Sequence, residues 1–103
     1  ERVLGDREFL AELIELFAED GPNLLEQLGD AISRQDGPQA AKTAHTFKGT
    51  IGNFCAAAAH QMAYEVELLC KEGDFGQAGQ RWNALKEEVE LVQTALQKLL
   101  QEA

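Results

Sequence analysis

The sequence predicts an all-α fold, an antiparallel four-helix bundle with an additional short N-terminal helix covering one end. Apolar residues recur three and four positions apart in five segments, as they do along the buried face of a helix. No segment alternates apolar and polar residues with the period of two that a half-buried strand requires. Proline and glycine cluster only at the four joints. The 103 residues, 45% of them apolar, suffice for a single domain, residues 1–103.

The N-terminal third predicts two helices separated by a stop signal. Asp6 is a suitable N-cap for a helix over residues 7–19, and Gly21-Pro22 ends that helix and opens a second one over residues 22–34. The expected core positions are Phe9, Leu10, Leu13, Ile14 and Phe17 in the first helix and Leu24, Leu25, Leu28, Ala31 and Ile32 in the second. The run Asp36-Gly37-Pro38 repeats the stop-and-start pattern.

Three further helices are expected, over residues 38–52, over residues 56–72, and from residue 75 to at least residue 99. Gly73 is a good C-terminal cap, and Asp74 with Gln77 resembles a capping box. The expected core positions are Ala59, Met62, Ala63, Val66, Leu69 and Cys70, then Phe75, Ala78, Trp82, Leu85, Val89, Val92, Leu96 and Leu99. At about 1.5 Å per residue the last helix is about 40 Å long, against about 20–25 Å for the three before it. The short first helix is expected to cover this overhang.

The net charge of −9 argues against nucleic acid as a partner. Its distribution is uneven. Residues 34–71 carry three acids and four bases, whereas residues 1–33 carry nine acids and two bases and residues 72–103 carry six acids and three bases. The middle of the chain is therefore +1 and the flanks together are −10. We expect the middle of the chain to dock on an acidic, anion-bearing surface.

Other features predict the cellular setting. No run of about 18 apolar residues exists, so we expect no membrane contact by this segment. Cys55 and Cys70 lie fifteen positions apart without a metal-ligand pattern, and they are expected to be reduced residues of a cytoplasmic protein. The chain opens with Glu1 rather than methionine, which favours a domain excised from a longer protein.

The third predicted helix has two unlike sides. At about 100° per residue, one side gathers the expected core residues Ala40, Ala44, Phe47, Ile51 and Phe54. His45 points about 140° away from the middle of that stripe and is expected to face solvent or a partner. Its face also holds Ala41, Lys42, Lys48, Gly49 and Gly52. Glycine within a helix costs about 1 kcal/mol relative to alanine, so the two glycines indicate that something approaches the histidine closely.

The residues around this histidine read His45-Thr46-Phe47-Lys48-Gly49, followed by Gly52-Asn53-Phe54. This run resembles the motif of histidine-containing phosphotransfer (HPt) domains, and the resemblance extends over nearly all of the chain. Such domains are small helical bundles that relay phosphoryl groups in two-component signalling. The resemblance implies a monomeric phosphocarrier of a longer signalling protein, with no cofactor. The sequence has no Gly-rich phosphate loop, so we expect no ATP site in this chain. Its partner would be the aspartate of a response-regulator receiver domain.

The resemblance also implies roles for particular residues. His45 would be the phosphoacceptor, because a neutral imidazole presents a nitrogen lone pair to phosphorus. Lys48 lies one turn further on and would hold the phosphoryl oxygens as their charge grows. Gly49 would leave a gap for the donor's aspartyl phosphate. The expected partner-docking residues are Ala41, Lys42, Gly49, Gly52 and Lys71.

Glu67 lies 22 residues after His45, on the row of the fourth helix that borders the core. In phosphotransfer domains similar to that of the chemotaxis histidine kinase, a glutamate at this spacing accepts a hydrogen bond from the other imidazole nitrogen. This resemblance implies that Glu67 orients the imidazole. The other interpretation is an i,i+4 surface ion pair with Lys71. If the parent protein is a sensor histidine kinase of that kind, an ATP-bound histidine kinase catalytic domain would be the phosphoryl donor.

Other classes of helical protein conflict with particular residues. A carboxylate-bridged metal bundle needs Glu-x-x-His pairs, but Lys42 stands three residues before His45. Ala57 stands in the same place before His60, so no metal site is expected. The dimerisation domain of a sensor kinase would have an acid directly after its histidine, where this chain has Thr46. The alternative that stays open is a helical adaptor or docking module without phosphotransfer chemistry, which acid-labile phosphate on the histidine would exclude.

Overall fold

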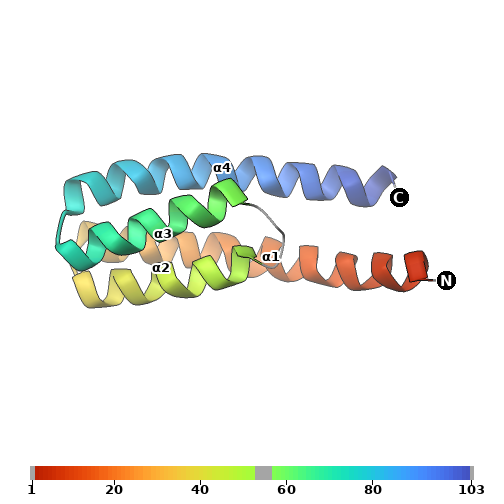
Figure 1. Cartoon of the computed structure of the whole chain (residues 1–103), viewed down its shortest axis with the longest axis horizontal. Helices are drawn as coiled ribbons and strands as arrows, with labels where there is room; N and C mark the ends of the chain where they lie inside the picture. The colour runs from red at the N-terminus through yellow and green to blue at the C-terminus, as the bar shows by residue number, and fades with distance from the viewer. Residues whose placement is uncertain (1, 53–56, 103) are drawn as a thin grey trace.

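The computed structural model describes residues 2–52 and 57–102, and every regular element within these residues is a helix (Figure 1). The helices are α1 (Arg2–Ser33), α2 (Gly37–Gly52), α3 (Ala57–Glu72) and α4 (Phe75–Glu102). The predicted all-α class is confirmed. The molecule is elongated, with extents of 49 × 19 × 19 Å. Among the helices described, none is both long and apolar enough to cross a membrane.

The four helices form an antiparallel bundle in which each helix packs against the next and α4 returns to pack against α1 (Figure 1). α2 and α3 have 16 residues each, whereas α1 has 32 and α4 has 28. The N-terminal half of α1 and the C-terminal half of α4 therefore extend together beyond α2 and α3 (Figure 1). Ala18 of α1 and Gln93 and Gln97 of α4 line one groove between these two helices. The overhang of the last helix thus has the N-terminal part of the chain as its neighbour.

The expected short N-terminal helix is not a separate element, because α1 runs without interruption through Pro22. A proline inside a helix removes one hydrogen bond and crowds the carbonyl group four residues earlier, at a cost of about 3 kcal/mol. Phe17, Leu25 and Leu28 stand on both sides of this proline and are buried in one core. Each such burial stabilises the fold by about 1.5–3 kcal/mol, so a continuous helix outweighs the cost of the proline.

The core lies between the four helices, and the expected α2 stripe of Ala40, Ala44, Phe47 and Ile51 is fully buried. Two other expected core residues, Phe9 and Leu99, are instead 62% and 51% exposed. Both lie in the extension, where a pair of helices cannot enclose a side chain on all sides. The side chains of Leu10, Leu13, Phe54 and Cys55 lie outside the described residues. Cys70 is a free thiol, and its burial raises its pKa.

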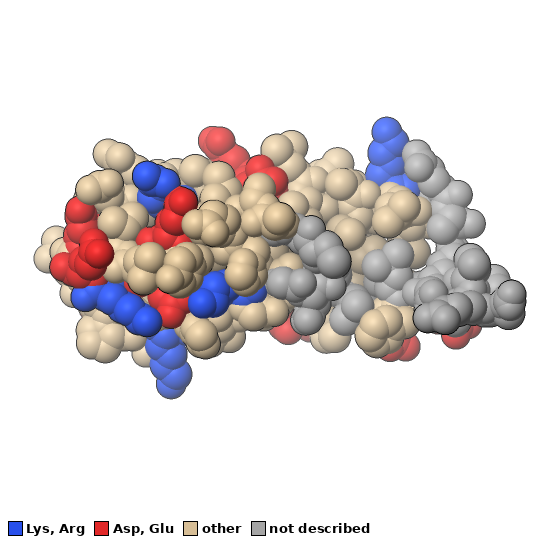
Figure 2. All heavy atoms as spheres, viewed as in Figure 1, with Lys and Arg blue, Asp and Glu red and all other residues tan. Residues whose placement is uncertain are grey.

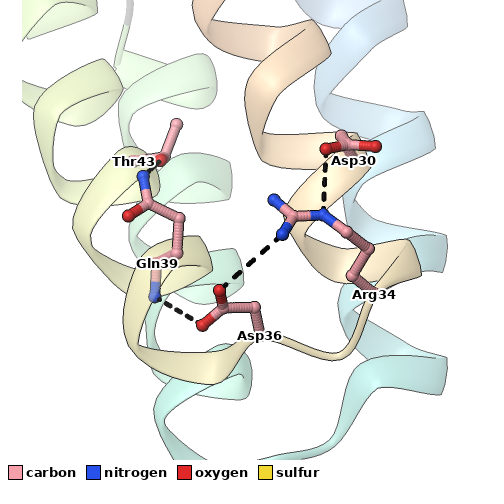
Figure 3. Close-up of polar contacts among 5 residues, drawn as sticks. All are labelled: Asp30, Arg34, Asp36, Gln39 and Thr43. Carbon is pink, nitrogen blue, oxygen red and sulfur yellow. Dashed lines mark hydrogen bonds and ion pairs between the residues drawn. The ribbon is translucent and has the colours of Figure 1, made fainter.

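The turn between α1 and α2 is stabilised by the residues predicted to interrupt the chain there (Figure 3). Gln35 adopts a left-handed φ of 57°, and the Asp36 N–H donates to the Ala31 carbonyl oxygen at 2.9 Å. Asp36 Oδ1 accepts a hydrogen bond from the Gln39 N–H at 3.2 Å and thereby caps the start of α2. The Arg34 guanidinium lies 3.9 Å from the other oxygen of Asp36. This short turn holds the start of α2 against the end of α1.

The turn between α3 and α4 has the predicted caps. Gly73 adopts φ of 80°, a conformation that favours glycine. Asp74 Oδ1 accepts a hydrogen bond from the Gln77 N–H at 3.2 Å, and Gln77 Nε2 donates to Asp74 Oδ2 at 2.8 Å. The Gln77 side chain therefore binds the carboxylate of the cap rather than its backbone N–H, which differs from the usual capping box.

Two glycines of α1 make room for aromatic rings. A Cβ at Gly29 would lie 2.7 Å from Trp82 Cζ2, and the Trp82 Nε1–H donates to the Leu25 carbonyl oxygen at 2.9 Å. A Cβ at Gly21 would lie 3.1 Å from Phe17 Cε1. Gly21 is therefore a packing residue and not the helix stop that the sequence suggests.

Replacing Gly29 by alanine should destabilise the domain by about 1–3 kcal/mol, because the Trp82 ring must move and its hydrogen bond to α1 weakens. Helix propensity alone would give the opposite sign, a gain of about 1 kcal/mol. Gly49→Ala is the matched control, since nothing lies within 4 Å of a Cβ added there, and this variant should be at least as stable as the wild type. Chemical denaturation measures both. Equal stability of the two variants would contradict the packing role of Gly29.

Candidate functional site

His45 lies on the outward side of α2, and 67% of its side chain is exposed. Its direction follows from the apolar stripe of the same helix. Because Ala44 and Phe47 are fully buried, α2 is rotated so that His45 stands at the edge that α2 shares with α3. An exposed imidazole with one neighbour from the next helix is accessible to a second molecule.

That neighbour is Glu67 of α3, whose side chain is only 5% exposed. Its Oε2 atom lies 3.2 Å from His45 Nδ1 and 3.2 Å from Lys71 Nζ. Its Oε1 atom lies 3.1 Å from Lys48 Nζ, in an ion pair that lacks the angles of a hydrogen bond. One buried carboxylate therefore holds the imidazole and two ammonium groups together. Glu67 therefore makes both of the contacts considered from the sequence, the ion pair with Lys71 and the contact with the His45 imidazole.

The contact with Glu67 determines which nitrogen of His45 is free. An ionised carboxylate only accepts hydrogen bonds, so Nδ1 carries the proton in the neutral ring that bonds to it. The lone pair of the neutral ring is then on Nε2. The contact with Glu67 therefore leaves Nε2 as the ring nitrogen that can bind a second molecule.

The charge of Glu67 is maintained by its surroundings. Burial raises the pKa of this carboxyl group, but the ammonium groups of Lys48 and Lys71 outweigh burial, and the net effect is a pKa below the ordinary value of 4.5. Glu67 is thus ionised at neutral pH, which the hydrogen bond from the imidazole requires.

The lowered pKa makes the contribution of Glu67 to stability depend on pH. A carboxyl group with a lower pKa in the folded chain than in the unfolded chain stabilises the fold above the unfolded value, here about 4.5. That contribution is lost as the pH falls through the folded value. Glu67→Gln removes the titration, so its free energy of unfolding should fall less steeply below pH 4.5 than that of the wild type. Chemical denaturation at a series of pH values measures this, and parallel profiles would refute it.

Two contacts hold the Lys48 side chain against the protein surface. Its side chain is 18% exposed, although it belongs to the outward part of α2. The ammonium group lies beside Glu67 and 4.9 Å from the centroid of the Tyr64 ring of α3. These two contacts place the ammonium group against the carboxylate that also contacts the imidazole.

The remaining expected docking residues are placed differently from one another. Lys42 and Gly49 are exposed, and 59% of the Lys71 side chain is exposed. Ala41 differs from the expectation, because it is only 8% exposed and belongs to the core. Its methyl group is short enough to be covered, whereas the imidazole one turn further on reaches beyond the core. Gly52 is the last residue of α2, and its surroundings lie outside the described residues.

The face that α3 presents in Figure 2 carries several Lys and Arg side chains over the four-helix part, with acidic side chains between them. Among the basic residues of α2 and α3, Lys48 and Lys71 are both paired with Glu67. Cationic groups at an exposed imidazole favour the approach of an anionic partner.

Tyr64 is the residue of this site to which the sequence alone assigns no role. It stands one turn before Glu67 on α3, in the row beside the core that also contains Lys71. The one-turn spacing indicates that the two side chains are neighbours. The spacing does not reveal that Lys48 of α2 contacts both side chains.

Fold and site together define a class of protein: an antiparallel helical bundle that presents an outward imidazole, bonded to a buried carboxylate and bordered by lysines. The family model of the Hpt domain matches residues 12–102, and the chain belongs to this family. Hpt domains transfer phosphoryl groups through a histidine in two-component phosphorelays, with response-regulator receivers as partners, and they are phosphocarriers rather than enzymes. Comparison with curated proteins and with solved structures gave no match.

Proposed function

We propose that His45 is the phosphoacceptor of this Hpt domain and exchanges its phosphoryl group with the aspartate of a receiver domain. The observation that carries the proposal is the 3.2 Å contact between His45 Nδ1 and the buried Glu67 carboxylate. This contact supports a fixed imidazole with its free nitrogen directed to a partner. A surface histidine without chemistry needs no such buried acceptor.

In the transfer step the lone pair of His45 Nε2 attacks the phosphorus of the aspartyl phosphate. The new phosphorus–nitrogen bond forms as the phosphorus–oxygen bond to the aspartate breaks, and the electron pair leaves on the aspartate carboxylate. The imidazole becomes positively charged, and the Glu67 carboxylate stabilises that charge through the Nδ1–H. Catalysis of this kind consists of positioning and charge stabilisation, which the residues of this site supply without a cofactor.

Lys48 acts on the transferring group. Charge develops on the phosphoryl oxygens in the transition state, and a positioned ammonium group stabilises it. In the unphosphorylated protein the ammonium group is neutralised by Glu67 at 3.1 Å. Once the imidazole becomes cationic, Glu67 has a third positive partner beside Lys48 and Lys71, and the ammonium group of Lys48 is available to the phosphoryl oxygens.

The receiver docks on the exposed residues around His45. Lys42 and Lys71 contribute positive charge, and Gly49 leaves open space one turn beyond the histidine. Gly52 extends this small-residue strip toward the end of α2. The charge distribution supports this choice of surface, since residues 34–71 carry the only positive balance of the chain.

We also infer the wider setting of the domain. It acts as a monomer in the cytoplasm, as one domain of a longer signalling protein such as a sensor histidine kinase, and it has no ATP site of its own. The donor is a receiver domain or, in a parent of the chemotaxis-kinase kind, the ATP-bound catalytic domain of the kinase.

The test is incubation of the domain with a receiver charged with acetyl phosphate, and separately with ATP alone. The charged receiver should produce acid-labile phosphate on His45, and ATP alone should produce none. Binding of the receiver without any labelling would contradict phosphotransfer and favour the helical adaptor. Labelling by ATP alone would contradict the absence of a nucleotide site.

A further inference from the structure

We propose that Tyr64 is a positioning residue for phosphotransfer, which holds the Lys48 ammonium group beside Glu67 and His45. The proposal rests on the function inferred above and adds a residue of α3 to it. It is carried by one juxtaposition: the Lys48 ammonium group lies between a buried carboxylate and an aromatic ring, 3.1 Å from Glu67 Oε1 and 4.9 Å from the centroid of the Tyr64 ring.

The Lys48 side chain is less exposed than its position on α2 leads one to expect. A lysine on the outward side of a helix normally extends its charged end into water. Lys71 does so at this site with 59% of its side chain exposed, although it contacts the same carboxylate. Lys48 is only 18% exposed. The ion pair with Glu67 alone therefore does not explain why Lys48 lies close to the surface, and the additional contact is the Tyr64 ring.

The Tyr64 ring lies beside Glu67, where Lys48 can contact both side chains. Residues three apart on a helix are neighbours, so Tyr64 and Glu67 form adjacent parts of the surface of α3. Lys48 reaches across from α2 and contacts both. A separation of 4.9 Å between the ammonium nitrogen and the ring centroid is within the range of about 6 Å at which a cation is attracted to the face of a ring. Tyr64 itself is 41% exposed, so its ring is not required to fill the core.

These two contacts order the Lys48 side chain before phosphoryl transfer begins. A free lysine has many rotamers and must be ordered when the phosphoryl group arrives, which slows the step that it assists. The ring and the carboxylate order Lys48 beforehand. A cation–π contact at a partly exposed site corresponds to about a two- to fivefold effect on a rate.

The first arm of the test uses phosphoramidate as the phosphoryl donor, so that no receiver has to dock. In this reaction the phosphorus–nitrogen bond of the donor breaks with ammonia as the leaving group, and the new bond forms to His45. Tyr64→Leu should slow labelling about two- to fivefold. Tyr64→Phe keeps the ring face and should restore most of the rate. Equal rates for the leucine variant and the wild type would overturn the proposal.

A double-mutant cycle separates positioning from a direct effect of Tyr64. If the ring acts through the lysine, Tyr64→Leu should have no further effect in a Lys48→Ala background. If the two losses multiply, the tyrosine acts by some other route and the proposal is wrong.

The second arm is spectroscopic and does not depend on phosphotransfer. A ring face beside the ammonium group should shift the ε-methylene protons of Lys48 upfield by its ring current, and this shift should disappear in Tyr64→Leu and persist in Tyr64→Phe. Lys86, 5.5 Å from the centroid of the Trp82 ring, is the internal control and should be unchanged in both variants. An unshifted Lys48 in the wild type would overturn the proposal. Failure of labelling in the wild type, with the upfield shift present, would instead contradict the proposed function.

Discussion

His45→Gln should abolish phosphoryl acceptance while keeping the domain folded, with the free energy of unfolding lowered by at most the contribution of one hydrogen bond, about 0.5–1.5 kcal/mol. The chemical reason is that an amide has no nucleophilic lone pair comparable to that of imidazole, so nothing replaces the attacking atom. The structural reason is that 67% of the side chain is exposed and the core stripe of α2 does not include it. Labelling with a charged receiver, together with chemical denaturation, measures both effects.

His60→Gln is the matched control for this experiment. His60 is an exposed histidine on α3, outside the contacts made by Glu67. Its replacement should leave labelling unchanged. If His45→Gln is labelled as fully as the wild type, the phosphoacceptor lies elsewhere and His60 becomes the first position to examine.

Gly49→Gln should slow transfer from a charged receiver by on the order of a hundredfold, since misplacing reacting groups by about 1 Å is enough for such a loss. Nothing lies within 4 Å of a Cβ added at Gly49, so a long side chain fits without disturbing the domain. It then stands in the open space where the receiver approaches. The same change should stabilise the helix by something under about 1 kcal/mol, because glycine is a poor helix former.

Labelling by phosphoramidate is the control for Gly49→Gln, since a small donor needs little room. That rate should stay close to the wild-type value while the receiver-dependent rate falls. If both rates fall equally, the side chain disturbs the imidazole rather than docking. If neither falls, the glycine does not clear space for a partner.

Much of the site could be predicted because helical spacing determines direction. The step of 100° per residue separates His45 from the stripe of Phe47 and Ile51, and these two residues are fully buried. The cap at Asp74 was also predictable, because a short acceptor side chain at a helix start has one local partner. Asp36 was predictable only as part of a break between two helices. Local chemistry suffices for such features.

The continuity of α1 could not be predicted in this way. Pro22 is a local stop signal, and only the packing of α1 against α2 and α4 shows that the burial of residues on both sides of it outweighs its cost. The exposure of Phe9 also depends on the neighbouring helices, which here fail to bury a residue. Its spacing is that of a core residue, but α2 and α3 are too short to cover it.

The contacts of Glu67 were predictable only in part. Glu67 lies 22 residues after His45, which is the spacing of the orienting glutamate in similar phosphotransfer domains. It lies four residues before Lys71, which is the spacing of an ion pair within one helix. The third contact, with Lys48, depends on how far a long side chain of α2 bends toward α3. The burial of Ala41 depends likewise on the neighbouring helices. Such details follow from packing between helices, which the periodicity of one helix does not determine.

The most direct measurement of the mechanism is the position of the phosphoryl group on the imidazole. The domain, labelled with ¹⁵N and phosphorylated by a charged receiver, would be studied by ³¹P and long-range ¹H–¹⁵N NMR. The contact between Nδ1 and Glu67 predicts a phosphorus–nitrogen bond at His45 Nε2, with Nδ1 still protonated. Phosphorus bound to Nδ1, or to any residue other than His45, would contradict it.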